Sequence, residues 1–290
     1  MATVKEVKLA FIGGTGLYQI DGLEIVDSVD IDTPFGNPSD SIKIARFGDR
    51  KAAFLPRHGV GHRYLPTEIP VKANIWALKK IGIEKIIAVS AVGSLKEEIR
   101  PCDIVIPNQI IDRTKQRPST FFGDGLVGHL GFADPFCSDL SDLLYTTVKD
   151  LGYRVHRDET YVCMEGPIFS TRAESNMYRS WGGGVIGMTA IPESKLAREA
   201  ELCYALIAMS TDYDCWKEDE EDVTIEMIVQ NLQANTAAAQ SVIKKLMETV
   251  QDDVTCACQE AAQFAILTDP KLIPEDVKNK LALFYKKYWK

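Results

Sequence analysis

Short apolar runs rich in β-branched residues recur along this chain, and helix-like stretches separate them. Several runs are apolar at consecutive positions, which is typical of strands buried on both faces of a parallel sheet. The runs lie at 7–14, 51–56, 85–91, 103–111, 160–165, 185–188 and 202–211. Helical spacing or capping residues mark the intervening stretches 67–82, 140–152, 170–182 and 191–203. This alternation predicts an α/β fold with a mixed, largely parallel central β-sheet flanked by helices.

No internal repeat or low-complexity linker interrupts the alternation, so we expect one domain over residues 1–290. The chain has 290 residues, 46% of them hydrophobic, which is enough for a sizeable core. Residues 222–250 and the C-terminal tail, 268–290, have helical patterns. The tail ends in a basic amphipathic segment, interpreted as a solvated helix face rather than a membrane anchor.

The net charge and the apolar pattern limit which classes of molecule the protein can bind. The net charge is −8, from 33 basic and 41 acidic residues, so no broad positive surface is available for a nucleic acid. No apolar stretch reaches the length of a membrane span, and the N-terminus lacks the long apolar region of a signal peptide. We therefore expect a soluble, cytoplasmic protein without nucleic-acid or membrane partners.

The seven cysteines are an odd number. Five lie in apparent core segments and are predicted to be reduced, buried thiols, as in a reducing compartment: Cys102, Cys137, Cys163, Cys203 and Cys215. Cys256 and Cys258 form a close pair in the stretch TCAC. Two ligands are too few for a metal site, so the sequence predicts none and leaves a redox or stabilising role open.

Polar side chains follow several predicted strands, at the carboxyl ends where α/β sheets bind ligands. The stretch GGTGLY does not match the dinucleotide motif G-x-G-x-x-G, because Thr15 and Tyr18 stand where glycines are needed. Its backbone N–H groups and the Thr15 hydroxyl suit a small anion instead. The same predicted edge carries Arg57, His58, Ser90 and Thr189. Because a guanidinium matches phosphate oxygens bidentately, we expect a phosphate site, the alternative being a surface basic pair at 57 and 58.

Two aspartates, Asp212 and Asp214, follow the last apolar run in the stretch STDYDCW. In an extended strand, residues two apart face the same side with Cα atoms roughly 6.5 Å apart, so both can address one ligand. The pair alone is compatible with a turn or helix cap, with a glycosidase-like acid and nucleophile, or with carboxylates facing a bound base. A phosphate site favours the third, because phosphate then supplies the nucleophile and a carboxyl group assists the leaving group.

The stretches FIGGTGLY, PRHGVGHR, ANIWALK, SAVGSL, DPFC, EGPIFSTRAES, IGMTAIPE and MSTDYDCWKEDEE occur in this order. Together they resemble the 5′-methylthioadenosine phosphorylases of the trimeric purine nucleoside phosphorylase family, over residues 8–270. The resemblance implies phosphorolysis of S-methyl-5′-thioadenosine to adenine and 5-methylthioribose 1-phosphate, in purine and methionine salvage. It implies no metal and no organic cofactor, and inorganic phosphate is the co-substrate.

The resemblance also assigns roles to residues. Its phosphate site comprises Thr15, Arg57, His58, Ser90, Ala91 and Thr189. Met188 packs on the ribose, and Phe169 and Ser170 border the base. Adenine offers an amino donor at position 6 and an acceptor at N7, so a carboxylate and a protonated carboxyl group suit it. We expect Asp212, supported by Ser170, to be the general acid at N7 and Asp214 to bind the amino group, although the roles are exchangeable.

Two further sets of positions follow from the resemblance. Ile225, Ile228 and Val229 match the methylthio pocket, with core packing as the competing use. His129 and Leu267 match positions that the family lends to a neighbouring subunit, which implies a homotrimer with shared active sites.

Gly187 departs from the pattern, because some relatives carry there an asparagine that contacts the base. We expect its absence to loosen base selection, so that adenosine or methylthioinosine is an alternative substrate. A hydrolytic nucleosidase and a non-catalytic nucleoside-binding protein are the other functions considered, and the expected phosphate and acid groups argue against both.

Overall fold

The computed structural model describes residues 7–18, 20–217, 225–251 and 256–289, and for residues 15, 18 and 225–229 it describes the backbone alone. Within these residues the strands join in one nine-stranded sheet of order β2-β3-β4-β1-β5-β8-β7-β6-β9. The strands are β1 (Leu9–Gly13), β2 (Glu24–Val29), β3 (Ile42–Phe47), β4 (Arg50–Pro56), β5 (Lys85–Ser94), β6 (Ile104–Arg113), β7 (Val155–Met164), β8 (Gly183–Gly187) and β9 (Cys203–Tyr213).

The sheet is mixed, as the sequence predicts. The pairings β1–β4, β1–β5, β5–β9, β6–β7 and β7–β8 are parallel, and β2–β3, β3–β4, β5–β8 and β6–β9 are antiparallel. Because β5 also pairs with β9, the strands β5, β8, β7, β6 and β9 close into a ring. The carboxyl ends of β5 and β9 therefore lie side by side, and they carry most of the candidate site.

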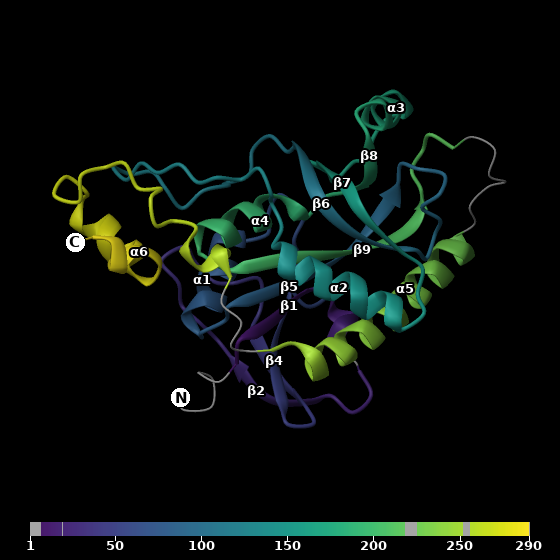
Figure 1. Ribbon diagram of the computed structural model, residues 1–290, viewed down its shortest axis with the longest axis horizontal. Helices are drawn as coiled ribbons and strands as arrows, with labels where there is room; N and C mark the ends of the chain where they lie inside the picture. The colour runs from purple at the N-terminus through teal and green to yellow at the C-terminus, as the bar shows by residue number, and fades with distance from the viewer. Residues whose placement is uncertain (1–6, 19, 218–224, 252–255, 290) are drawn as a thin grey trace.

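Helices cover both faces of the sheet (Figure 1). The α-helices are α1 (Val71–Lys80), α2 (Ser138–Asp150), α3 (Arg172–Ser180), α4 (Ala190–Glu199), α5 (Ile225–Thr249) and α6 (Glu275–Tyr285). Short 3-10 helices are η1 (Thr15–Tyr18), η2 (Ala257–Glu260) and η3 (Lys286–Tyr288). The capping box predicted at the start of α3 is confirmed, because Glu174 N donates to Thr171 Oγ1 at 3.2 Å and Thr171 N donates to Glu174 Oε2 at 2.8 Å.

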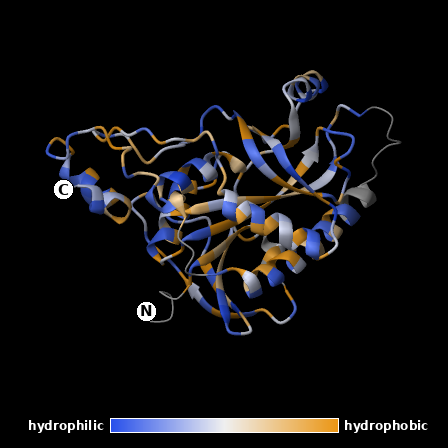
Figure 2. Ribbon diagram, in the orientation of Figure 1, coloured by the Kyte–Doolittle hydropathy of each residue, from blue (hydrophilic) through white to orange (hydrophobic). Residues whose placement is uncertain are grey.

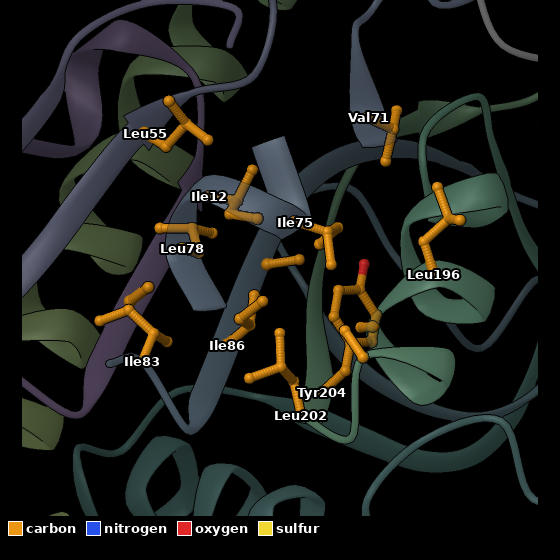
Figure 3. Close-up of a cluster of buried hydrophobic side chains, with 14 of the residues drawn as sticks. Ile12, Leu55, Val71, Ile75, Leu78, Ile83, Ile86, Leu196, Leu202 and Tyr204 are labelled. Carbon is orange, nitrogen blue, oxygen red and sulfur yellow. The ribbon is translucent and has the colours of Figure 1, made fainter. Parts of the chain in front are cut away.

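Alternate residues of β1 enter two different cores. Ala10 and Ile12 pack under α1 and α4, whereas Leu9 and Phe11 pack under α2 and α5. Figure 3 shows the first core, where Ile12 lies close to Ile86 of β5 and the α1 side chains Ile75 and Leu78. The hydropathy colouring follows the same division, with apolar residues along the central strands (Figure 2). Consecutive apolar residues thus mark strands that are covered on both faces.

Two details depart from the sequence expectations. Strands β2 and β3 are not predicted. Strand β2 is largely exposed at the sheet edge, and β3 mixes buried and partly exposed residues instead of forming a continuous apolar run. Cys215 is exposed and Cys102 half-buried rather than core thiols, since Cys215 follows the end of β9 and Cys102 lies in the turn before β6. The C-terminal tail agrees with the expected amphipathic helix: it buries one face, including Leu281 and Phe284, in the first core, and Lys286 and Lys287 are exposed.

None of the helices in the described ranges combines the length and the apolarity that a membrane crossing requires.

Candidate active site

Arg57 lies at the junction of three strand ends. It follows β4, and its backbone N–H donates to Gly13 O at the end of β1 at 2.9 Å. Its Nη1 donates to Val89 O in β5 at 2.9 Å, and only 3% of the residue is exposed. The surface-pair alternative for Arg57 is therefore wrong, because the guanidinium is buried across the carboxyl edge of the sheet.

The bidentate edge of Arg57 faces a carboxylate of the same chain. Nε donates to Glu193 Oε2 at 2.9 Å and Nη2 to Glu193 Oε1 at 3.0 Å, and Glu193 is 1% exposed. Burial alone would lower the pKa of Arg57, but the charge and hydrogen bonds of Glu193 raise it. Tyr204 of β9 donates to the same carboxylate at 2.8 Å. The expectation of a bidentate fork aimed at phosphate is thus corrected: Glu193, 136 residues away in sequence, takes that edge.

Two buried hydroxyl groups meet beside Arg57. Ser90 Oγ of β5 and Thr189 Oγ1 at the start of α4 lie 3.0 Å apart, and the residues are 7% and 9% exposed. Burial raises the pKa of Tyr161 to about 12, against the opposing effect of hydrogen bonds with Ser90 and Thr189. Three neutral hydroxyl groups therefore gather around the end of β8, between β5 and β7, where they can donate to an anion.

His58 is held in one orientation. Its Nδ1 lies 2.8 Å from Tyr64 O, and its ring stacks on His62 with centroids 4.2 Å apart. Burial lowers the pKa of His58, and the nearby positive charge of Arg57 lowers it further, against the opposing hydrogen bond to Tyr64. In the neutral ring Nδ1–H donates to the carbonyl, so Nε2 is an acceptor.

Gly187 ends β8 against the side chain of Tyr161. A Cβ atom at position 187 would lie 2.0 Å from Tyr161 Oη and 2.8 Å from its Cζ. The Tyr161 ring from β7 thus occupies the space into which a longer side chain at 187 would extend. The looser base selection expected from Gly187 stays a prediction.

The two aspartates flank Gly93 of β5. A Cβ atom at Gly93 would lie 3.3 Å from Asp212 Oδ1 and 3.4 Å from Asp214 Cβ. Strand β9 ends at Tyr213, one residue short of Asp214, although Asp214 N still donates to Ser94 O of β5 at 3.0 Å. The register shifts by one residue between Val92 and Gly93, which places Thr211 as the extra residue of a bulge. Bulges of this kind re-aim side chains near functional sites.

The surroundings of the two carboxyl groups differ. Thr211 Oγ1 lies 2.6 Å from Asp212 Oδ2 and 3.1 Å from Val92 O, and Asp212 is half-buried. Asp214 is 8% exposed, and its Oδ2 atom is buried without a hydrogen-bond partner among the residues described. A buried acceptor of this kind calls for a donor from a ligand.

The loop between β7 and α3 joins the aspartate end of β9. Ser170 O accepts from Cys215 Sγ at 3.3 Å, and the Ser170 hydroxyl donates to Met164 Sδ at 3.4 Å. Phe169 is 75% exposed beside it. The structure thus brings Ser170 next to the segment that follows Asp214, while its hydroxyl faces Met164.

Met188 is placed by an arginine that the sequence analysis missed. The Arg117 guanidinium, 2% exposed, donates to Met188 O, to Ile191 O at 2.6 Å and to Met164 O at 3.3 Å. It therefore ties the end of β7 to the start of α4. Arg117 in TKQRPST follows no predicted strand directly, so the strand-end criterion could not select it.

His129 and Leu267 lie together, away from the other candidates. His129 N donates to Ala265 O and Leu267 N donates to Val127 O, both at 2.9 Å. Both side chains are exposed, and so is Phe264 at 88%. In Figure 1 the C-terminal segment and α6 lie at the opposite end of the molecule from α3. Within one chain these two residues do not join the aspartates.

Several predicted positions are seen only in part. The Thr15 side chain lies outside the described residues, although η1 places its backbone directly after β1. The side chains of Ile225, Ile228 and Val229 are also outside, and α5 begins at Ile225. Ala91 is exposed next to Ser90, whose hydroxyl donates to Ala91 O at 3.2 Å.

A cavity of about 330 Å³ lies elsewhere, lined by Phe35, Pro70, Arg117 and Lys280 among others, and holds none of the predicted site residues.

The fold and this strand-end site define the class of protein: the chain belongs to the phosphorylase superfamily, whose family model matches residues 8–248. The chain is 51% identical to the S-methyl-5′-thioadenosine phosphorylase of Geobacter sulfurreducens over 284 residues, 98% of this chain and 99% of that protein. A methylthioadenosine phosphorylase from an antarctic soil metagenomic library superposes with a TM-score of 0.93 at 45% identity, covering 97% of this chain and 99% of that one. The Schistosoma mansoni methylthioadenosine phosphorylase in complex with adenine gives 0.81 at 31% identity, covering 97% and 98%. These matches confirm the family predicted from the sequence.

Proposed function

We propose that the protein catalyses the phosphorolysis of S-methyl-5′-thioadenosine, which yields adenine and 5-methylthioribose 1-phosphate. The relatives named for this reaction match nearly the full length of the chain. The observation that carries the proposal is the distribution of groups along β5: Ser90 faces Thr189, and Gly93, three residues further on, faces both aspartates. Three residues of strand span about 10 Å, which is suited to phosphate below a ribose and carboxyl groups beside the attached purine.

Phosphate is the nucleophile in this scheme. It attacks C1′ while the bond from C1′ to N9 breaks, through a transition state with oxocarbenium character. The Ser90 and Thr189 hydroxyl groups donate to its oxygens, and neutral His58 accepts from its P–OH group at Nε2. Thr15, Ala91 and the remaining Nη1 proton of Arg57 complete the binding set. Oriented donors that exclude water are the main stabilisation available to such an anion.

Asp212 is the general acid that protonates N7 of the departing base. One hydroxyl proton of Thr211 faces two acceptors, Val92 O at 3.1 Å and Asp212 Oδ2 at 2.6 Å. The Thr211 hydroxyl donates to Asp212 Oδ2, which leaves Oδ1 to carry the proton that is delivered to N7. Protonation of the leaving group prevents a purine anion from forming.

Asp214 selects the adenine side of the purine. Its buried Oδ2 atom can accept a hydrogen bond from the exocyclic amino group, and an oxygen at position 6 would face it as a second acceptor. Phe169 and Ser170 border the base, Met188 packs on the ribose, and Ile225, Ile228 and Val229 hold the methylthio group. We expect adenosine to be used less well, since it lacks the apolar 5′ group.

The active assembly is a homotrimer in which each chain lends His129 and Leu267 to a neighbour. The support is the exposure of Phe264 and Leu267, 88% and 64%, on the paired segments around 128 and 266. Apolar side chains so exposed mark a subunit contact. The products suit purine and methionine salvage in the cytoplasm.

Phosphate dependence tests the proposal. Adenine release from S-methyl-5′-thioadenosine, adenosine, inosine and methylthioinosine is measured with and without phosphate. We expect fast release from the first only with phosphate, and a loss of phosphate dependence in the double variant Ser90→Ala, Thr189→Val. Equal rates in phosphate-free buffer would identify a nucleosidase instead, and tight binding without turnover would identify a binding protein.

A further inference from the structure

Four cysteine sulfur atoms converge at the start of β9. The Sγ atoms of Cys137, Cys203, Cys256 and Cys258 all lie within 4.8 Å of one another, and those of Cys137 and Cys256 are 3.5 Å apart. The TCAC stretch alone offers two ligands, which is why the sequence predicts no metal. The fold adds the other two from positions more than fifty residues away in sequence.

We propose that these four cysteines form a structural zinc site. Zinc binds four thiolates tetrahedrally at about 2.3 Å, so the sulfur atoms of such a site lie about 3.8 Å apart. The observed separations bracket this value and allow closure by small side-chain rotations. A set of four sulfur ligands without a carboxylate or imidazole favours zinc over magnesium or calcium.

The ligands sit on ordered elements. Cys137 is the N-cap residue of α2, and its backbone N–H donates to Tyr204 O at 2.8 Å, next to Cys203. Cys256 is the N-cap residue of η2, and its carbonyl accepts from Gln259 N at 2.9 Å. Cys137, Cys203 and Cys258 are at most 8% exposed, while Cys256 is half-buried and leaves an entry path for the ion.

The charge of the site is partly balanced. Four thiolates on a divalent cation carry a net charge of −2, and the positive end of the α2 dipole lies at Cys137. The Arg198 side chain of α4 also acts electrostatically on Cys258. Binding releases four protons and forms four zinc–sulfur bonds without electron transfer. Disulfides within the cluster would instead need an oxidant.

The site lies at the opposite end of β9 from the aspartates. Cys203 is the first residue of β9 and Asp212 is nine residues further on, about 30 Å along an extended strand. Zinc would therefore clamp the segment after α5 onto the sheet without touching substrate. Its loss is expected to lower the melting temperature and leave kcat/KM unchanged at temperatures where the protein stays folded.

The experiment measures zinc in the full-length protein, purified under reducing conditions from zinc-supplemented medium. Mass spectrometry of the metal content should give about one zinc ion per chain. The variants Cys256→Ser and Cys258→Ser should lose the zinc, whereas the control Cys102→Ser, outside the cluster, should keep it. Cobalt added to the metal-free protein should produce the intense visible bands of tetrahedral thiolate coordination, a readout that needs no variant.

Two results would overturn the proposal. One is a zinc content in the unaltered protein no higher than in Cys256→Ser, with no tetrahedral cobalt spectrum. The other is mass-spectrometric detection of disulfides among the four cysteines in protein kept reduced throughout. Neither result bears on phosphate dependence, so this proposal and the proposed function fail separately.

Discussion

Arg57 and Glu193 form a buried ion pair through two hydrogen bonds, Nε to Oε2 at 2.9 Å and Nη2 to Oε1 at 3.0 Å. The pair is nearly free of solvent, with both side chains at most 3% exposed. It joins the end of β4 to the first turn of α4. The positive charge nearest to the proposed phosphate site is therefore already compensated, and phosphate relies largely on hydroxyl donors.

Glu193→Gln leaves a buried cation without its counter-charge. We expect a loss of about 3–5 kcal/mol in the free energy of unfolding by urea, since breaking a buried pair strands a charge. The uncompensated Arg57 should also attract phosphate, so phosphate should raise the melting temperature more than in the unaltered protein. Glu24→Gln, which breaks the exposed pair with Arg46, serves as the control and should change neither quantity. An equal or smaller phosphate effect in Glu193→Gln would place phosphate away from Arg57.

Asp212→Ala should lower kcat by about 10²–10⁴-fold, the range of general acid catalysis. The defect should disappear with an N7-methylated nucleoside, whose base departs as a neutral molecule without being protonated. Asp214→Ala is the matched comparison: it should weaken selection for the 6-amino group and show no such rescue. Near-normal turnover by Asp212→Ala would refute its role as the general acid. Rescue of Asp214→Ala by the N7-methylated nucleoside would instead show that the two roles are exchanged.

Gly187→Ala should destabilise the protein by about 1–3 kcal/mol, because the added methyl group overlaps the Tyr161 hydroxyl. Tyr161→Phe removes the closest atom of that overlap. The two changes should therefore be coupled: Tyr161→Phe should cost less free energy of unfolding in the Gly187→Ala background than alone. Additive effects in the double-mutant cycle would show that the two side-chain positions do not compete for space.

The lowered pKa of His58 gives stability a defined pH dependence. The unfolded chain takes up a proton near the ordinary histidine pKa of about 6.5, while the folded chain takes it up only at lower pH. Unfolded molecules thus bind more protons in this window, and the contribution of His58 is lost as pH falls below 6.5. Comparing unfolding at pH 7.5 and 5.5, His58→Gln should lose less stability than the unaltered protein. A greater loss of stability between pH 7.5 and 5.5 in His58→Gln than in the unaltered protein would show that folding raises the pKa of His58.

Shared active sites can be tested by mixing inactive chains. Asp212→Ala lacks the acid of its own site, and His129→Ala lacks the residue lent to a neighbour. Co-assembled chains should regain activity at about one quarter of the sites, those formed by the two intact contributions. Asp212→Ala mixed with Asp214→Ala should gain no activity beyond that of the two variants measured separately, because both defects lie in the same chain's part of the site. Equal recovery in the two mixtures would contradict the sharing of sites.

Much of the architecture was predictable because it is local in sequence. Buried strands appear as continuous apolar runs, and the Thr171–Glu174 cap appears as a four-residue motif. Strand β2 was not predicted, because a six-residue strand at the exposed edge of the sheet has no continuous apolar run. The strand-end rule brought Ser90 and the aspartates to one edge correctly, since the parallel strands β5 and β9 share their carboxyl ends. Thr189 reaches Ser90 for another reason: β8 runs antiparallel to β5.

The contacts that orient the site were not predictable in the same way. Glu193 lies 136 residues from Arg57, and in sequence it is one acidic residue of a helix start. Tyr161 is one aromatic residue of a strand, and nothing local relates it to Gly187. The same limit applied to the cysteines, where counting neighbours in TCAC missed two sulfur atoms supplied by the fold.

The contact between Gly187 and Tyr161 also constrains how this chain can diverge. A larger side chain at 187 is blocked while the Tyr161 hydroxyl stands 2.0 Å from the position of its Cβ atom, so the change at 161 must come first. A chain with a smaller residue at 161 and glycine still at 187 then has neither the tyrosine hydroxyl nor the asparagine amide in the pocket. Mutational routes between this version of the pocket and one with asparagine at 187 thus have a fixed order, and their least fit step is the first.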